Sequence, residues 1–473
     1  MLNVLGPMQN SRHGKYLGLP IIISKSKMEV FAKIKEKVGK KLAGWKEKML
    51  SMGGREILFK TVAQAIPTYT MSCFQLPKCL CDEMEGMMRI FWWGQCQQES
   101  KIAWVGWRKL CKSKDRGGMG FRDLQAFNLA LLAKQGWRLL TNPDSLGAQI
   151  YKARYYPHGD VLKAKPRSNP SYTWRSIRNG LEVIRKGTRW RVGNENLIHI
   201  WEDKWLPTPT TYKVISPPRL FDGFPMVSNL IDKDTRRWKA DLVRTLFLPF
   251  EATTILNIPL SYSLPEDKII WVGNKMGEFT VKSAYYIALN LSKGEVDEEC
   301  SSGDCRAPLW KRIWHLKIPS KIRIFGWRAC LNGLPTAENL KKRGINTSEL
   351  CPCCEKEPES IIHSLLRCEI AKKVWNCWWE CPIDIPSSQW DFSDVALEIL
   401  AQGTTMDPEA YFVTAWSIWY NRNQVVHESI CQLPNHIWNF TKRYLPDYKE
   451  ASSFFGQDKT AVVGVPLLLE YLK

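Results

Sequence analysis

The chain has 473 residues, of which 44% are hydrophobic and 24% charged, a composition typical of a folded protein with roughly two to four domains. Its 67 Lys and Arg residues outnumber its 47 Asp and Glu residues, which gives a formal net charge of +20. An excess of this size favours nucleic acid as a partner, with an ordinary solvated basic surface as the alternative.

Neither a membrane helix nor a secretory signal is expected. No apolar run approaches the ~18–20 residues that a membrane span requires, and residues 1–15 lack the apolar core of a signal peptide. The 15 Cys residues are therefore expected to be reduced thiols, so clusters among them indicate metal sites before disulfides. The 22 Trp residues are expected mostly in the core, and stacking on bases is their alternative use.

The first third of the chain is predicted to be helical after a short strand in KYLGLPIII. In residues 28–50 apolar side chains recur at steps of three and four, which predicts one amphipathic helix whose lysines fall largely off the apolar stripe. Further helices are expected at about 54–65, from about 78, and in AFNLALLAKQGWRLL. Residues 1–140 hold 24 Lys and Arg against 10 Asp and Glu, so most of the positive charge lies here.

Between about 94 and 122 the sequence is basic and irregular, and Gly117, Gly118 and Gly120 predict a turn that bulkier residues would resist. The middle third is mixed. Two strand-like regions, one around the Gly-Asn pair at 193–194 and one around that at 273–274, are each predicted to form a β-hairpin, the second followed by a helix from about Lys282.

Two segments are predicted linkers: the Pro-rich residues 206–218 and the acidic, Ser-rich residues 292–305. The second is the expected domain boundary. After it, three short helices punctuated by Pro319 and Pro335 lead directly into CPCCEKEPESIIHSLLRC. In residues 383–473 one helical segment, AYFVTAWSIWYNRNQVVHE, is predicted, and the remainder shows no assignable pattern.

Four residues of the cysteine-rich segment have the spacing of a zinc site. Cys351, Cys354, His363 and Cys368 form C-x2-C-x8-H-x4-C, and three thiolates with one imidazole suit tetrahedral Zn²⁺. Because four protein ligands leave no open position, the site is predicted to be structural, not hydrolytic. The last two ligands are five positions apart, about 140° on a regular helix, so the helix must loosen near Arg367 for both to face one ion.

Other cysteines leave the ligand set open. Cys353 adjoins Cys354 and offers C-x-C in place of C-x2-C, while Cys377 and Cys381 could each replace the last ligand. Reduced thiols without a metal are the structural alternative. A thioredoxin-type redox role is disfavoured, because no βαβ pattern surrounds the C-x2-C pair.

The chain contains GKYLGLPIIISKSK, LAGWKEKMLSMGGREILFKTVAQAIPTYTMSCFQLP, FWWG and GGMGFRDLQAFNLALLAKQGWRLL. These stretches closely resemble the downstream part of plant LINE-type (non-LTR) retrotransposon reverse transcriptases. WRVGNENLIHIWEDKWLP and EFTVKSAYY resemble the region that follows, and PLWKRIWHLKIPSKIRIFGWRACLNGLPTAENLKKRGI with the cysteine-rich segment resembles the family's zinc-binding domain. The match covers roughly residues 13–430 in the family's own order.

This resemblance implies four regions and a fold class. Residues 1–140 correspond to a thumb-like helical region, 141–295 to a mixed connection, 306–382 to the reverse-transcriptase zinc-binding domain, and 383–473 to a helical tether remnant with an unassigned tail. The expected fold class is mainly α with small β-hairpin elements. The family's zinc ligands fall on Cys351, Cys354, His363 and Cys368, although Glu369 stands where the family usually has Pro.

The catalytic parts of such enzymes are not recognised in this sequence. Reverse transcriptases hold two Mg²⁺ on the carboxylates of a Tyr/Phe-x-Asp-Asp hairpin upstream of the YLG segment, and this chain has no Asp-Asp dipeptide. Nor is a ribonuclease H carboxylate set seen after His427. We therefore expect a retrotransposon-derived fragment that binds nucleic acid, carries a structural zinc module and lacks both catalytic centres.

Two alternatives stay open: part of an active RNA-directed DNA polymerase and RNA–DNA hybrid ribonuclease polyprotein, or a zinc-stabilised module that docks a protein. For nucleic-acid binding, whether to an RNA template, a DNA target or their hybrid, the expected phosphate contacts are Lys33, Lys37, Lys40 and Lys41. An ordinary solvated helix face is the alternative for each of them. The expected location is intracellular, in the nucleus.

Overall fold

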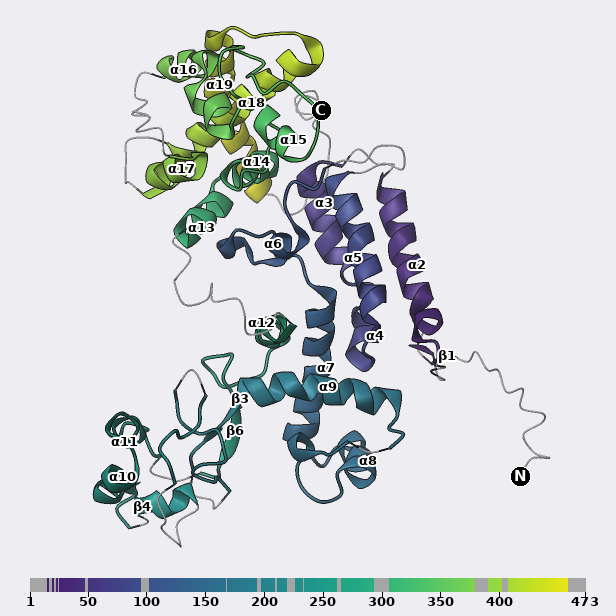
Figure 1. Ribbon diagram of the computed structural model, residues 1–473, viewed down its shortest axis with the longest axis vertical. Helices are drawn as coiled ribbons and strands as arrows, with labels where there is room; N and C mark the ends of the chain where they lie inside the picture. The colour runs from purple at the N-terminus through teal and green to yellow at the C-terminus, as the bar shows by residue number, and fades with distance from the viewer. Residues whose placement is uncertain are drawn as a thin grey trace, which may run out of the picture. The chain divides into compact units, whose positions relative to one another are not determined.

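The computed structural model describes residues 15–16, 19–20, 23, 25–46, 50–94, 102–166, 168–193, 197–208, 211–218, 226–232, 234–261, 265–292, 306–378, 390–401 and 407–457. Within these residues the protein is mainly α-helical, with three two-stranded antiparallel sheets (Figure 1). The predicted fold class is confirmed. Over the same residues, none of the helices combines the length and the hydropathy needed to span a bilayer.

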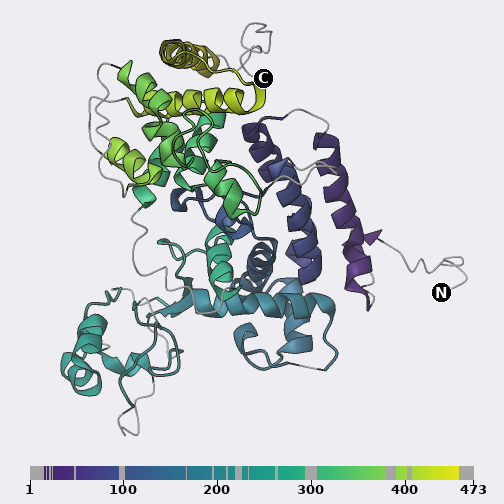
Figure 2. The ribbon, with the colours of Figure 1, turned by 45° about the horizontal axis from the view of Figure 1, so that its top comes forward.

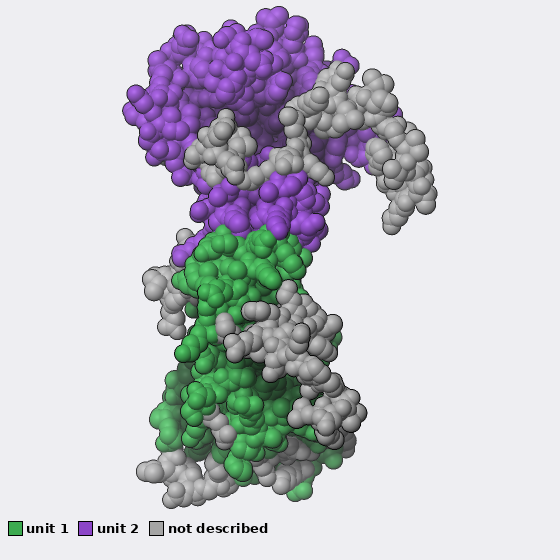
Figure 3. All heavy atoms as spheres, turned by 90° about the vertical axis from the view of Figure 1, so that its right-hand side faces the viewer, with its two compact units in different colours: residues 1–37, 65–84, 123–298 green, residues 38–64, 85–122, 299–473 purple. Residues whose placement is uncertain are grey.

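The chain forms two compact units, coloured separately in Figure 3. Unit 1 comprises residues 1–37, 65–84 and 123–298, and unit 2 comprises residues 38–64, 85–122 and 299–473. Helices α2 (Lys27–Lys46) and α5 (Lys78–Trp93) supply residues to both units. The expected division into four regions remains a prediction, and its boundary at 292–305 lies almost entirely outside the described residues.

The amphipathic helix predicted near the N-terminus is α2. Its stripe residues Phe31, Val38 and Leu42 are buried, as the three- and four-residue spacing predicts. The next predicted helix is α3 (Met52–Leu58), which continues into a π-helical turn at Phe59–Ala63. Both predictions are confirmed, as is the helix that begins at Lys78.

Unit 1 is built around two helices that pack against each other, α7 (Leu124–Thr141) and α9 (Tyr172–Gly187). Figure 1 and Figure 2 show that α9 crosses α7. Gly180 of α9 makes the close crossing possible, because a Cβ there would lie 2.6 Å from the backbone nitrogen of Ala133. The unit's other helices and N-terminal strands are β1 (Lys15–Tyr16), β2 (Leu19–Pro20), α4 (Thr68–Cys73), α8 (Leu146–Tyr155), α10 (Ala240–Leu246), α11 (Pro249–Leu256) and α12 (Val281–Ser292).

The two predicted β-hairpins are wrong. Strand β3 (Thr188–Arg191), which precedes the first Gly-Asn pair, instead pairs antiparallel with β6 (Lys268–Trp271), which precedes the second. The Asp267 carboxylate fixes this pairing by accepting hydrogen bonds from the backbone N–H groups of Gly193 and Leu197. The only other strands described in the middle third are β4 (Ile231–Asp232) and β5 (Arg237–Trp238).

Residues 198–258 form a small hydrophobic core of their own, which includes the buried Trp205, Leu230 and Ile255. The described part of the predicted 206–218 linker is fixed to this core. The buried Glu251 carboxylate accepts the backbone N–H groups of Ile215 (2.6 Å) and Ser216 (2.9 Å). A buried carboxylate needs such donors, so this segment is ordered by hydrogen bonding despite its prolines.

Unit 2 holds the remaining helices. The three short helices predicted after residue 305 are confirmed as α13, α14 and α15, and α18 matches the predicted C-terminal helix. Helices α17 and α19 were not predicted; α19 carries Pro446 in its interior, which argues against a helix in the sequence. The bounds are α6 (Trp107–Cys111), α13 (Ala307–His315), α14 (Ser320–Cys330), α15 (Ala337–Lys342), α16 (Glu369–Asn376), α17 (Phe392–Ala401), α18 (Pro408–Glu428) and α19 (Pro434–Gln457).

The predicted glycine turn packs against α13 and α14 within unit 2. Gly117 has φ +73°, which favours glycine, and a Cβ there would lie 2.8 Å from the indole of Trp310. The Gly117 carbonyl accepts the indole N–H of the fully buried Trp327 at 2.9 Å. The helices that precede the cysteine-rich segment are therefore anchored on residues from the first third of the chain.

Candidate metal centre

The first two cysteines lie on a tight loop. Leu350 and Pro358 form an antiparallel bridge, and the backbone N–H of Cys351 donates to the Glu357 carbonyl at 2.8 Å. The loop closes through Glu355, whose φ is +56° and whose N–H donates to the Cys351 carbonyl. A C-x2-C step on such a loop can direct both thiols to one side.

The second pair of ligands is separated by the loosened helix that the spacing requires. Residues His363–Arg367 form a π-helical turn, and the Cys368 N–H donates to the carbonyl of His363, five residues back, at 2.7 Å. Cys368 itself is extended, with φ −57° and ψ 140°, and α16 begins at Glu369. The Trp375 indole N–H donates to the Leu365 carbonyl, which satisfies a group that the wider turn leaves open. The predicted break is confirmed, and it needs no proline after the last cysteine.

The four predicted ligands meet at one point. One possible ligand atom from each of Cys351, Cys354, His363 and Cys368 lies within 4.8 Å of every other. The Cys351 and Cys368 sulfurs are 3.9 Å apart, and the Cys354 sulfur is 3.3 Å from His363 Nε2. A tetrahedral ion with Zn–S near 2.3 Å and Zn–N near 2.0–2.1 Å would place sulfurs about 3.8 Å apart and sulfur and nitrogen about 3.5 Å apart. The residues therefore fit a closed Cys3His metal site.

The alternative cysteines are placed differently. Cys377 follows the last residue of α16, whereas Cys368 precedes the first. The Cys377 thiol lies within hydrogen-bond distance of two acceptors, the Asn435 side-chain oxygen at 2.9 Å and the Lys373 carbonyl at 3.2 Å. Cys353 hydrogen bonds with Cys351 but is not among the four clustered ligand residues. Cys381 lies outside the described residues. The geometry thus favours the C-x2-C pair and Cys368.

Hydrogen bonding within the cluster favours the thiolate form of Cys351, the form of cysteine that binds metal ions, whereas the hydrogen bond with Cys351 raises the pKa of Cys368. The Cys353 and Cys368 side chains lower the pKa of Cys351 by hydrogen bonding to its sulfur. A hydrogen bond with Cys351 raises the pKa of His363 to about 9. His363 Nδ1 lies 3.1 Å from the Glu357 carboxylate, so Nδ1–H can donate there while Nε2 faces the sulfurs. Sequence analysis did not identify Glu357, because an acidic residue in a charged loop carries no spacing signal.

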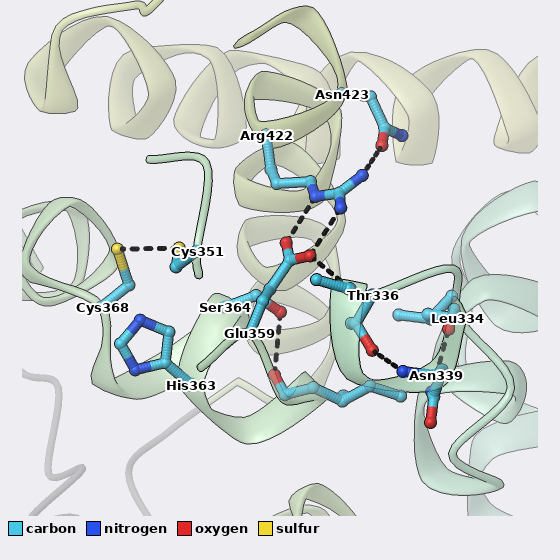
Figure 4. A network of polar contacts seen from close by, with 12 residues as sticks. Leu334, Thr336, Asn339, Cys351, Glu359, His363, Ser364, Cys368, Arg422 and Asn423 are labelled. Atoms are coloured by element: carbon cyan, nitrogen blue, oxygen red, sulfur yellow. Dashed lines mark hydrogen bonds and ion pairs between the residues drawn. The ribbon is translucent and has the colours of Figure 1, made fainter. Parts of the chain in front are cut away.

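A buried ion pair ties the cluster to α18. Glu359 is fully buried and Arg422 nearly so, and the Glu359 carboxylate accepts two hydrogen bonds from the guanidinium, at 2.5 and 2.6 Å (Figure 4). The same carboxylate accepts the backbone N–H of Ala337 at the start of α15. Arg422 also lies over the Trp419 ring. Three donors thus hold the Glu359 carboxylate, four residues before His363.

We expect Glu359→Gln to destabilise unit 2 by about 3 kcal/mol, because it leaves the Arg422 charge buried without a counter-charge. The measurement is denaturant unfolding at neutral pH. The matched control is Glu369→Gln, which breaks the exposed ion pair with Lys356 and should leave stability almost unchanged. Equal effects of the two substitutions would contradict the assignment of the buried pair as an anchor.

The predicted phosphate contacts all lie on α2. Lys33, Lys37, Lys40 and Lys41 are exposed and fall within about 100° of one another around the helix axis. They lie opposite the buried stripe, so the sequence pattern placed them correctly on the helix. Contact with nucleic acid remains a prediction.

The comparisons with known proteins agree with the cluster. The family model described as zinc-binding in reverse transcriptase matches residues 279–375, which include all four candidate ligands. A putative ribonuclease H protein of Arabidopsis thaliana is 28% identical over 364 residues, which are 76% of this chain and 57% of that protein. The chain therefore spans little more than half the length of this relative.

A second relative is covered almost completely. An uncharacterized mitochondrial protein of Arabidopsis thaliana is 44% identical over 147 residues, which are 31% of this chain and 96% of that protein. Together with the zinc-binding family match, this similarity shows that the chain belongs to the plant retrotransposon reverse-transcriptase-related proteins.

Proposed function

We propose that this retrotransposon-derived chain binds nucleic acid and is held in shape in part by one structural Zn²⁺ on Cys351, Cys354, His363 and Cys368. The observation that carries the zinc assignment is the convergence of these four ligand atoms within 4.8 Å. The family match to a zinc-binding domain supports it. Bound there, the ion would cross-link the 351–354 loop to the start of α16, and no open coordination position would be left for catalysis.

We expect the purified protein to contain about one Zn²⁺ per chain. Cys354→Ser should lose most of this zinc and weaken zinc affinity more than tenfold, because one of four ligands is removed. Mass spectrometry under native conditions and a chelator competition would measure this. Cys377→Ser is the matched control and should keep its zinc, since that thiol bonds elsewhere. Wild-type protein that is metal-free and fully folded would overturn the zinc assignment.

Nucleic-acid binding is supported by charge and its placement. The chain has a net charge of +20, and four exposed lysines share one face of α2. The similarity to a putative ribonuclease H protein and the match to a zinc-binding family of reverse transcriptases also support this proposal. We also propose an intracellular location in the nucleus, where a chromosomal DNA target would be met.

Replacing Lys33, Lys37, Lys40 and Lys41 by Gln should weaken binding to an RNA–DNA hybrid and flatten its salt dependence. Each lost phosphate contact removes about 0.9 from the slope of log affinity against log salt. Titrations between low and moderate salt, followed by fluorescence anisotropy, would measure the slope. The control removes the same charge from four other exposed lysines, at positions 213, 268, 275 and 282. Wild-type affinity that hardly changes with salt would overturn backbone neutralisation as the mechanism.

We further propose that this chain binds without performing polymerase or ribonuclease chemistry. The sequence lacks an Asp-Asp pair to hold two Mg²⁺, which supports this view. The rival is an active reverse transcriptase or hybrid ribonuclease. Primer extension and hybrid cleavage with Mg²⁺ or Mn²⁺ should give no turnover above a blank. Turnover that copurifies with the protein would establish the rival.

A further inference from the structure

Four aromatic side chains form a partly exposed cluster on α18 and α19, which pack together in unit 2 (Figure 2). We call Trp416, Tyr420, Phe440 and Tyr444 the aromatic ledge. The Trp416 ring lies 6.0 Å from those of Tyr420 and Tyr444, and Phe440 lies 5.2 Å from Tyr444. The interplanar angles of these pairs are 32°, 30° and 26°, and the Trp416 and Phe440 rings are tilted by 42°, so the rings lie face to face with moderate tilts.

The ledge is not part of the buried core of unit 2. Trp416, Phe440 and Tyr444 are only partly buried, and 51% of Tyr420 is exposed. On the same helix α18, Tyr411 and Phe412 are completely buried and already supply the core with aromatic surface. A half-exposed tyrosine at the end of a stacked series gains little for stability, but its ring is accessible for stacking with a ligand.

Positive charge adjoins the ledge. The Lys321 ammonium of α14 lies 4.6 Å from the centre of the Trp416 ring and 5.8 Å from that of Tyr444. The Lys321 side chain is partly buried, and this burial lowers the pKa of its ammonium. The other cations of α14 lie elsewhere, because Arg328 lies over Trp93 and Arg323 donates to the Trp314 carbonyl, so Lys321 supplies the charge at the ledge.

The carboxylates at the start of α18 pair with a lysine other than Lys321: Asp407 and Glu409 both contact Lys449 of α19. Helix α19 also carries two carboxylates, Asp447 and Glu450, and two further cations, Lys442 and Arg443. A ligand at the ledge therefore meets flat apolar rings with the Lys321 ammonium beside them, a combination that suits a base joined to a phosphate.

We propose that the aromatic ledge binds unpaired bases of single-stranded nucleic acid, with Tyr420 as the accessible stacking surface. Bases in a duplex are stacked on one another and do not present their faces, whereas a single strand can place a base on an exposed ring. This inference rests on the proposed nucleic-acid binding and names one class of ligand for it. It is separate from the α2 lysines, which would contact the phosphates of any strand.

The test compares a single-stranded 12-nucleotide oligothymidylate with an RNA–DNA hybrid of the same length, by fluorescence anisotropy on the full chain. Tyr420→Ala should weaken single-strand binding about tenfold, within the range measured when a stacking aromatic is removed, and should leave hybrid binding unchanged. Tyr420→Trp should restore single-strand binding. Tyr69→Ala is the matched control, because Tyr69 is 49% exposed in unit 1 and should change neither affinity.

Each of the other possible outcomes contradicts either the ledge proposal or the proposed function. If hybrid binding is intact and Tyr420→Ala does not change single-strand affinity, the ledge proposal is wrong and the proposed function stands. Equal losses on both ligands show that the substitution acts through the fold or through charge, and also overturn the ledge. Absence of binding to either ligand overturns the proposed function, whichever variant is used. Thermal unfolding of each variant confirms that the folded proteins are being compared.

Discussion

The π-helical turn at His363–Arg367 is the constraint on which the candidate metal centre depends. An α-helix would rotate Cys368 about 140° away from His363, so three ligands could meet but the fourth could not. The wider turn and the extended backbone of Cys368 remove that rotation. The turn is itself supported, because the buried Trp375 indole donates to the Leu365 carbonyl. Packing of α16 therefore stabilises the π-helical turn, which brings Cys368 to the other three ligands.

The cluster is also fixed from its other side. Glu359 lies two residues before the short helical segment at 361–367 that carries His363, and its carboxylate is held by Arg422 of α18 and by the start of α15. Partners of a buried carboxylate cannot move independently without losing several kcal/mol. The metal-ligand segment is therefore coupled to the helices of unit 2 and is not an isolated loop. Because α13 and α14 pack on the Gly117 turn, that coupling reaches residues from the first third of the chain.

Local pattern was enough to predict what depends on local physics. The spacing of apolar residues predicted α2, the glycines predicted the turn at 117–120, and the cysteine spacing predicted which ligands converge. Local pattern could not predict the pairing of distant strands. Strands β3 and β6 are some eighty residues apart, and each strand by itself looks like half of a hairpin. Nor does any spacing connect Glu359 with Arg422, since their contact exists only after the helices have packed.

Four lysines share one face of α2. The buried stripe of Phe31, Val38 and Leu42 provides the apolar packing of this helix, and the four lysines lie on its exposed face. Lys33 and Lys37, like Lys37 and Lys41, are four positions apart, where like charges destabilise a helix by a few tenths of a kcal/mol per pair. A polyanion lying along this face would convert that repulsion into attraction. Glu29 and Glu36 each lie four positions before a lysine of this face, a spacing that stabilises a helix and offsets this repulsion. The free protein therefore tolerates the charge on α2, and contact of this face with phosphates stays a prediction.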